Sequence, residues 1–167
     1  MIWMALDLGA RRIGVAVTDD AGIMAHPVTT LETDRRGAFP LDALRALIDE
    51  RGVGGIVVGL PRRLDGTFGP EAQAAEALAD ELRGALGMRV ELWDERLTTV
   101  EADRLLIEAG VRRNKRRGAA DRIAAALILQ GFLDHHDGSD AATGEPGPDG
   151  EQPASSSDST VPGPRQA

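Results

Sequence analysis

The amino-acid sequence predicts an α/β fold in which a five-stranded mixed sheet is flanked by helices. Three features lead to this prediction. Three apolar-rich runs lie close together within residues 2–31, two later apolar runs each follow a helical pattern, and the last periodic segment is apolar nearly all round. Strands separated by so few residues pair as antiparallel neighbours, whereas a strand that follows a helix can return parallel to an earlier one.

The first three runs predict an antiparallel meander. Residues 2–8 and 13–19 are separated by a short connection at residues 9–12, and an Asp-Ala-Gly turn leads into residues 23–31. Turn residues between apolar runs of this length are typical of consecutive strands. We therefore expect three adjacent strands at the start of the chain.

Helices and strands alternate after this meander. Pro40 opens a helical pattern that Gly52 closes, and residues 54–59 form a short buried strand. Pro70 begins an Ala-rich helix that Gly87 stops. Proline in the first turn and glycine just past the last turn are the expected asymmetry of helix ends. Both helices are therefore predicted with defined beginnings and ends.

The rest of the body predicts one strand and two helices. Residues 88–93 form the strand, and residues 98–101, Thr-Thr-Val-Glu, are a capping box for a helix that ends at Gly110. A final helix covers about residues 118–133. The order βββαβαβαα, with both later strands parallel to the first, is the layout of the ribonuclease H-like fold.

Length and composition predict one domain with a tail. A chain of 167 residues fits a single domain, which we assign to residues 1–134. Residues 135–167 are rich in Gly, Pro, Ser and Asp, so they cannot offset their ordering entropy by burial and are expected to be disordered. The chain has no cysteine, no leader-like start and no apolar run long enough for a membrane span. We expect a cytoplasmic protein with no membrane partner, and its oligomeric state is unknown.

The distribution of charge favours a phosphate-containing partner, despite a net charge of −8. From Asp134 onward the chain has seven acidic residues and one basic residue, Arg165, so this part carries a net charge of −6. The remaining residues, 1–133, therefore carry a net charge of −2. Five of the residues 112–117 are basic, and clustered basic residues on a nearly neutral body are typical of nucleic-acid binding. The alternatives are a solvated loop at residues 112–117 and a structural turn at residues 59–63. The residues that we expect to contact nucleic acid are Arg11, Arg12, Arg62, Arg113, Lys115, Arg116 and Arg117.

Two carboxylates stand near the ends of predicted strands. Asp7 follows an apolar run, where a buried charge is costly unless it is paired or binds metal. Glu95 comes just after a predicted parallel strand, at the edge where open α/β sheets bind ligands. The structural alternatives are a pairing of Asp7 with Arg11 or Arg12, and a pairing of Glu95 with Arg96.

A third carboxylate, Asp121, lies in the first turn of the final helix, where its structural alternative is an interaction with the helix dipole. The predicted topology brings the three acids to one edge of the sheet, where they would repel one another unless cations neutralise them. Oxygen ligands without His or Cys nearby select Mg²⁺ or Mn²⁺. We therefore expect Asp7, Glu95 and Asp121 to be the catalytic residues and to hold two ions that hydrolyse a phosphodiester. His26, His135 and His136 are expected to be non-catalytic.

The segments around these acids carry a resemblance to a known family. They are Asp7-Leu8-Gly9 with Arg12-Ile13-Gly14-Val15-Ala16, Gly59-Leu60-Pro61, Asp94-Glu95-Arg96-Leu97-Thr98-Thr99, and Asp121 leading Ala124-Ala125-Ala126-Leu127-Ile128-Leu129. Over about residues 2–133 the chain closely resembles the YqgF family of pre-16S rRNA nucleases, also described as Holliday junction resolvases. The resemblance implies a ribonuclease H-like bacterial cytoplasmic protein that trims the 5′ end of pre-16S rRNA during ribosome biogenesis. It also implies that Asp7, Glu95 and Asp121 occupy the positions of the acidic triad.

Three other functions are compatible with parts of the sequence. A resolvase-like nuclease acting on branched DNA would use the same acids, and an RNA-binding assembly factor would keep them for structure. An ATP-dependent phosphotransferase of the actin or sugar-kinase type shares the Asp7-Leu8-Gly9 hairpin, but it needs a second similar domain for which residues 1–133 leave no room. Structured RNA is therefore the expected partner, with branched DNA as the alternative.

Overall fold

The computed structural model describes residues 1–63, 65–94 and 116–140, with side chains in the last range for residues 118–136. Its elements in chain order are β1 Ile2–Leu8, β2 Arg12–Thr18, β3 Ala25–Glu32, α1 Leu41–Arg51, β4 Val53–Leu60, α2 Pro70–Leu86, β5 Arg89–Asp94 and α4 Arg116–Asp140. The meander and the alternation that follows it are confirmed. The capping-box helix expected at residues 98–110 lies outside the described residues.

The five strands form one mixed sheet in the order β3-β2-β1-β4-β5. The β1–β2 and β2–β3 pairs are antiparallel, whereas β4 pairs parallel with β1 and β5 pairs parallel with β4. The predicted strand directions are therefore confirmed. Because β4 separates β5 from β1, the carboxyl ends of β1, β4 and β5 lie in a row along one edge of the sheet.

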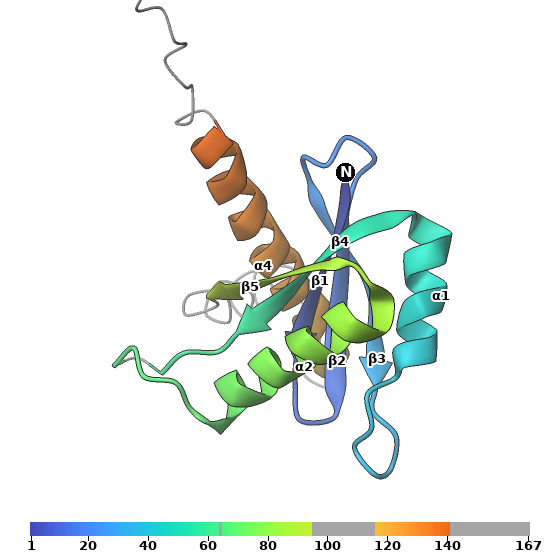
Figure 1. The fold of residues 1–167 in the computed structure, drawn as a ribbon, viewed down its shortest axis with the longest axis vertical. Helices are drawn as coiled ribbons and strands as arrows, with labels where there is room; N and C mark the ends of the chain where they lie inside the picture. Colours follow the sequence, from blue (N-terminus) through green and yellow to red (C-terminus); the bar gives the residue numbers. More distant parts are fainter. Residues whose placement is uncertain (64, 95–115, 141–167) are drawn as a thin grey trace, which may run out of the picture.

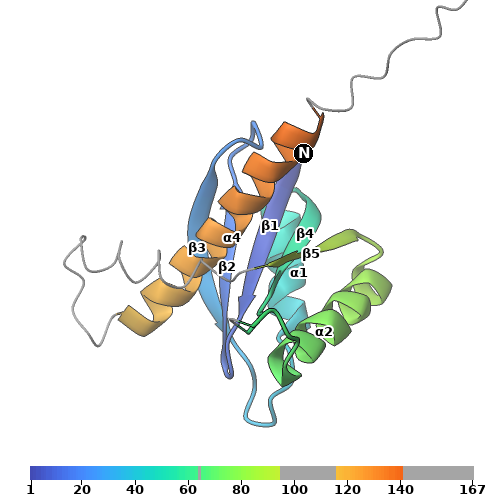
Figure 2. The same cartoon turned by 90° about the vertical axis from the view of Figure 1, so that its left-hand side faces the viewer.

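Helices cover both faces of this sheet. α4 lies across one face, and α1 and α2 lie against the other (Figures 1 and 2). Alternate residues of each strand follow this division: Trp3 and Ala5 are buried with α4, whereas Met4 and Leu6 are buried in the cluster on the α1 and α2 side. The layers fix which strand residues face α4, and that face carries the candidate site.

Both short helices end at the glycines that the sequence indicated. Gly52 and Gly87 adopt left-handed φ values of 64° and 61°, and their N–H groups bond the carbonyls of Ile48 and Arg83. A residue with a β-carbon is strained in this conformation. Glycine therefore sets where the chain leaves each helix and enters the next strand.

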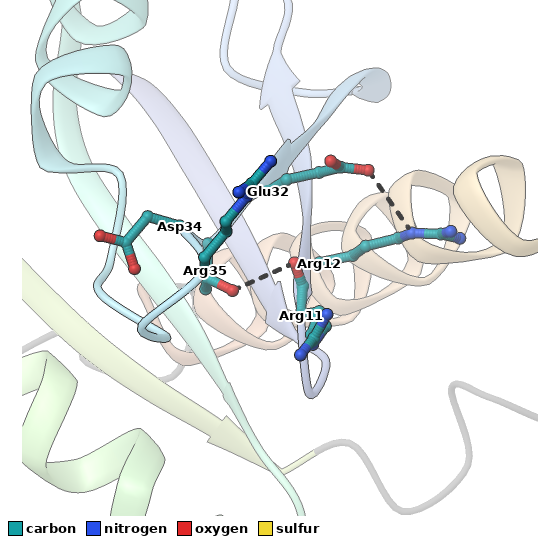
Figure 3. Close-up of a pocket in the computed structure, with 6 residues that line it drawn as sticks. Arg11, Arg12, Glu32, Asp34 and Arg35 are labelled. Carbon is teal, nitrogen blue, oxygen red and sulfur yellow. Dashed lines mark hydrogen bonds and ion pairs between the residues drawn. The ribbon is translucent and has the colours of Figure 1, made fainter.

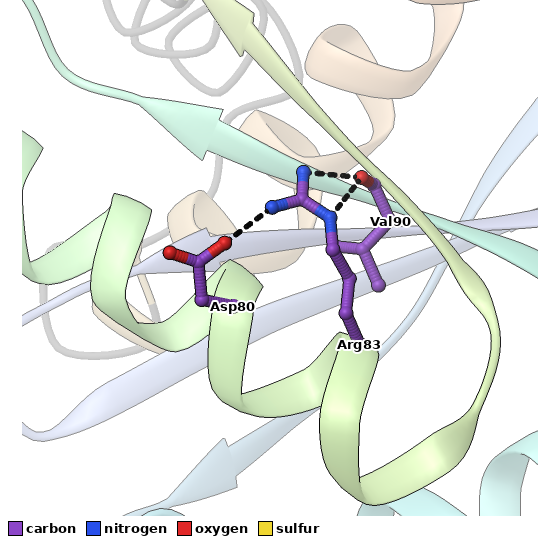
Figure 4. A network of polar contacts seen from close by, with 3 residues as sticks. All are labelled: Asp80, Arg83 and Val90. Carbon is purple, nitrogen blue, oxygen red and sulfur yellow. Dashed lines mark hydrogen bonds and ion pairs between the residues drawn. The ribbon is translucent and has the colours of Figure 1, made fainter.

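Arg83 ties α2 to the edge strand β5 (Figure 4). Its Nε and Nη2 donate to the Val90 carbonyl at 3.0 and 2.6 Å, and its Nη1 bonds Asp80 Oδ1 at 2.6 Å. These contacts tie the amino end of β5 to α2.

α4 is longer than the sequence indicated. It was expected to end near residue 133, but it runs to Asp140, so His135 and His136 belong to the helix instead of the predicted tail. Thr30 Oγ1 donates to the Gly118 carbonyl at 2.9 Å, and Gln130 Oε1 accepts from the Ala25 N–H at 3.0 Å, which fixes the helix over β3. None of the helices in the described ranges is long and apolar enough to cross a bilayer.

Candidate functional site

Asp7 lies near the carboxyl end of β1 on the face that α4 covers, in line with Trp3 and Ala5. Its neighbour on β2 is Gly14. On β4, one step beyond the Leu6–Val58 pair, its neighbour is Gly59. Two adjacent strands therefore present no side chain beside Asp7, which is partly buried. This is an unusual setting for a carboxylate within a sheet.

Gly14 also sets the distance between the sheet and α4. A β-carbon at Gly14 would collide with the backbone carbonyl oxygen of Asp121. The backbone of α4 therefore rests directly on β2 at Gly14. Gly14 pairs with Asp7, and directly paired residues of antiparallel strands lie about 5 Å apart, so this contact lies beside Asp7. The fold thus brings Asp7 and Asp121, 114 residues apart in the chain, to neighbouring positions at one edge of the sheet.

The surroundings of Asp121 disfavour its charged form. Partial burial raises the pKa of the Asp121 carboxyl above its ordinary value, and the nearby Arg12 guanidinium opposes this rise. Asp121 and Arg12 line a pocket of about 460 Å³ together with Arg11, Gly9 and Ala10. The acid therefore faces an open space at the β1–β2 turn with arginines beside it.

Arg62 and Asp94 pair at the ends of β4 and β5. Arg62 Nη1 lies 3.5 Å from Asp94 Oδ2, each side chain is 31% exposed, and the guanidinium stacks on the Phe68 ring at 4.6 Å. The pair gives Asp94, which stands in the segment just before Glu95, a structural role at this edge of the sheet. Arg62, which we expected to contact nucleic acid, is engaged within the protein.

The remaining predicted site residues are only partly within the described ranges. Glu95, Arg113 and Lys115 lie outside them, and for Arg116 and Arg117 the structure gives the backbone at the start of α4. Arg11 is exposed in the β1–β2 turn, and Arg12 Nε lies 3.8 Å from Glu32 Oε1. Within the described ranges, no three acidic or histidine side chains form a group that could hold a metal ion. Two of the three predicted acids are thus brought together, and the third falls outside the described residues.

The donors that are present fit a divalent cation in their chemistry. Asp7 and Asp121 offer carboxylate oxygens as ligands. His26, the histidine nearest the start of the chain, is exposed on β3. A hard cation would offset the cost of keeping charge on the partly buried Asp121.

Sequence reasoning missed the glycines and the residues just after β3. Gly14 and Gly59 stood in the quoted motifs, but only the strand register reveals that they flank Asp7. Thr33, Asp34 and Arg35 line a pocket next to Arg11 and Arg12 (Figure 3). In the sequence, the adjacent basic residues Arg35 and Arg36 were the feature that could have indicated this pocket.

Comparisons with known proteins agree with this arrangement. Residues 1–135 match the family model described as "RuvX: Holliday junction resolvase". A "Putative pre-16S rRNA nuclease" of Geobacillus kaustophilus is 50% identical over 132 residues, which cover 78% of this chain and 96% of that protein. A protein of the same description from Myxococcus xanthus is 49% identical over 135 residues, covering 80% of this chain and 87% of the relative.

A solved structure supports the same fold. The crystal structure of the fowlpox virus Holliday junction resolvase superposes with a TM-score of 0.51 at 10% identity, covering 81% of this chain and 99% of that one. At this identity the likeness concerns the fold, which is the ribonuclease H-like arrangement predicted from the order of elements. By its family match and its close relatives, the chain belongs to the RuvX family, also called YqgF, and is a nuclease.

Proposed function

We propose that the protein is a metal-dependent nuclease that processes the 5′ end of precursor 16S rRNA in the bacterial cytoplasm. The observation that carries this proposal is the meeting of Asp7 and Asp121 across Gly14 at the carboxyl edge of the sheet. The description of the relatives as pre-16S rRNA nucleases supports the substrate. Processing of this RNA would give the protein a part in ribosome biogenesis.

Asp7, Glu95 and Asp121 would hold Mg²⁺ or Mn²⁺ ions. When bound, two such ions supply an activated water for in-line attack on phosphorus and stabilise the leaving oxygen. The chain contributes the carboxylates, the contact at Gly14 that sets α4 against β1 and β2, and the Arg12 guanidinium next to Asp121. The acids are therefore the catalytic residues in this proposal.

The arginines around this edge would bind the RNA backbone. Arg11 and Arg12 line the pocket of Asp121, and the basic segment at residues 112–117 leads into α4, which carries Asp121. Backbone contacts position a strand without reading its sequence. The residues proposed for this role are Arg11, Arg12, Arg62, Arg113, Lys115, Arg116 and Arg117, of which Arg62 also pairs with Asp94.

Cleavage of a precursor 16S rRNA fragment by purified variants tests the proposal. Asp7→Asn, Glu95→Gln and Asp121→Asn should each abolish cleavage that depends on Mg²⁺ or Mn²⁺, with an unchanged circular dichroism spectrum. Asp49→Asn, at an exposed position of α1, is the matched control and should cleave like the parent. RNA binding by the parent without cleavage in the presence of Mg²⁺ or Mn²⁺ would instead indicate an assembly factor. Cleavage by a variant that carries all three substitutions would indicate a contaminating nuclease.

Resolution of four-way DNA junctions is the second candidate, because the matching family model carries that description. A resolvase makes two symmetric cuts, which requires two copies of the site. Precursor rRNA and a DNA junction should be compared at matched salt concentration, since the affinity for either depends on salt. Faster cleavage of the junction, together with a dimer in solution, would favour this candidate over rRNA processing.

A further inference from the structure

Two adjoining pockets share the arginines of the β1–β2 turn. One contains Asp121, and the other, of about 330 Å³, lies between the turn and the segment that follows β3 (Figure 3). Arg11 and Arg12 line both pockets, and Arg35 lines the second. A path lined by arginines therefore leads from the carboxyl edge of the sheet to the β3–α1 connection.

The acids of the second pocket are engaged in holding the backbone and Arg12. Asp34 Oδ1 accepts hydrogen bonds from the Arg36 and Ala38 N–H groups, both at 2.8 Å. Glu32 pairs with Arg12 at 3.8 Å. Neither acid pairs with Arg11 or Arg35, and across the part of the chain that the structure describes these two exposed guanidiniums have no ion-pair partner.

The two segments that carry these arginines are tied together. The Thr33 N–H and Oγ1 both donate to the Arg11 carbonyl, at 3.1 and 3.4 Å. These two hydrogen bonds therefore set the spacing between the turn and the β3–α1 connection. Arg11 and Arg35 project from a fixed frame, although their side chains are exposed.

The guanidiniums point in different directions. In Figure 3, Arg12 extends toward α4, Arg11 lies over the β1–β2 turn, and Arg35 extends away from the turn. A site for a single anion needs donors that converge on one point. A polynucleotide instead presents one phosphate per nucleotide, which matches cations distributed along a path.

We propose that Arg11 and Arg35 bind successive backbone phosphates of the strand whose reacting phosphate lies at Asp7 and Asp121. The substrate strand then continues past the cleavage position toward the β3–α1 connection, and a mononucleotide cannot fill the path. This inference rests on the proposed function for the location of the reacting phosphate. Because the contacts are to phosphates, they act on any base sequence.

Binding of a labelled single-stranded RNA to the full chain tests the path. Fluorescence anisotropy is measured over a range of salt concentrations, with EDTA present to prevent cleavage. Arg35→Gln and Arg11→Gln should each weaken binding at low salt and reduce the slope of log K against log salt by about 0.7, the value for one lost contact to a single strand. Binding of a mononucleotide should not change with Arg35→Gln.

Arg51→Gln is the matched control. It removes the same charge from an exposed side chain that lines a pocket with Ile2 and Thr18, at the amino edge of β1. The control should keep the parent slope. An equal loss with Arg51→Gln, unchanged slopes for both path variants, or a mononucleotide affinity that falls with Arg35→Gln would each overturn the proposal.

Cleavage measured in parallel separates this proposal from the proposed function. If the parent cleaves RNA and the path variants bind like the parent, the path is wrong and the nuclease function stands. If the path variants lose slope but the parent cleaves under neither Mg²⁺ nor Mn²⁺, the path stands and the nuclease function fails.

Discussion

The fold shifts the pKa values of Asp19 and Asp121 in opposite directions. Backbone N–H groups lower the pKa of Asp19 below its ordinary value, with Ile23 the largest contributor and Met24 a further one. Burial raises the pKa of Asp121 instead. A carboxylate kept where its charge is disfavoured, next to a pocket, is typical of a functional position.

Replacing each of these acids by asparagine should have opposite effects on stability. The fold favours the charged form of Asp19, so this carboxylate stabilises the protein at pH values above its ordinary pKa of 3.8. The stabilisation is lost as the pH falls through the lower pKa that Asp19 has in the folded protein. Asp19→Asn should therefore lower the melting temperature at neutral pH, with the difference vanishing in acid. Asp121→Asn should preserve or raise the melting temperature at neutral pH in metal-free protein, because it removes a partly buried charge.

Thermal melts of the parent and both variants in EDTA over a pH series check this pair. Each variant is a control for the other, since both replace Asp by Asn. A marked loss of stability with Asp121→Asn would indicate that its carboxylate serves the fold, as the helix-dipole alternative supposes.

At the scale of elements, Gly14 determines how α4 meets the sheet. Gly14→Ala should destabilise the protein by about 1–3 kcal/mol, since an added methyl group in a close contact forces the backbone to shift. Cleavage should fall as well, because the contact that brings Asp121 to Asp7 is the one displaced. Denaturant unfolding and RNA cleavage measure the two effects.

Gly84→Ala provides the comparison for this substitution. A β-carbon at Gly84 in α2 would meet nothing within 4 Å, so this variant should be as stable as the parent or more stable. Parent-like stability and activity in Gly14→Ala would show that α4 can shift without consequence, and the proposed meeting of the acids would lose its support.

The ends of the elements differ in how well the sequence predicted them. Pro70, Gly52 and Gly87 act through local backbone geometry, so the bounds of α1 and α2 were predictable. The end of α4 depends on packing between distant segments. The ring centroid of His136 lies 6.4 Å from that of Trp3 on β1, and the ring centroid of His135 lies 5.4 Å from that of Trp93 on β5. No local signal in a polar, Gly-containing stretch reveals such contacts.

At the scale of the molecule, the order of elements was sufficient to predict the sheet, because short connections and helical crossovers leave few topologies. The acids Asp7 and Asp121 were also predictable as a pair from that topology. The pairing of Arg62 with Asp94 was not, because it depends on side-chain directions at the ends of two strands. The same limit applies to the path along Arg11 and Arg35.

The charge of the whole chain leads to a last prediction. Residues 141–167 contain four acids and Arg165, a net −3, so their removal changes the net charge from −8 to −5. RNA affinity at low salt should rise, because less negative charge opposes the approach of the RNA to the arginines. At high salt the two proteins should bind equally, since screening shortens the Debye length to about 3 Å at 1 M ionic strength. A full-length variant with the four acids replaced by their amides should bind like the shortened chain. A gain in affinity that persists at high salt would instead mean that these residues cover the binding surface sterically.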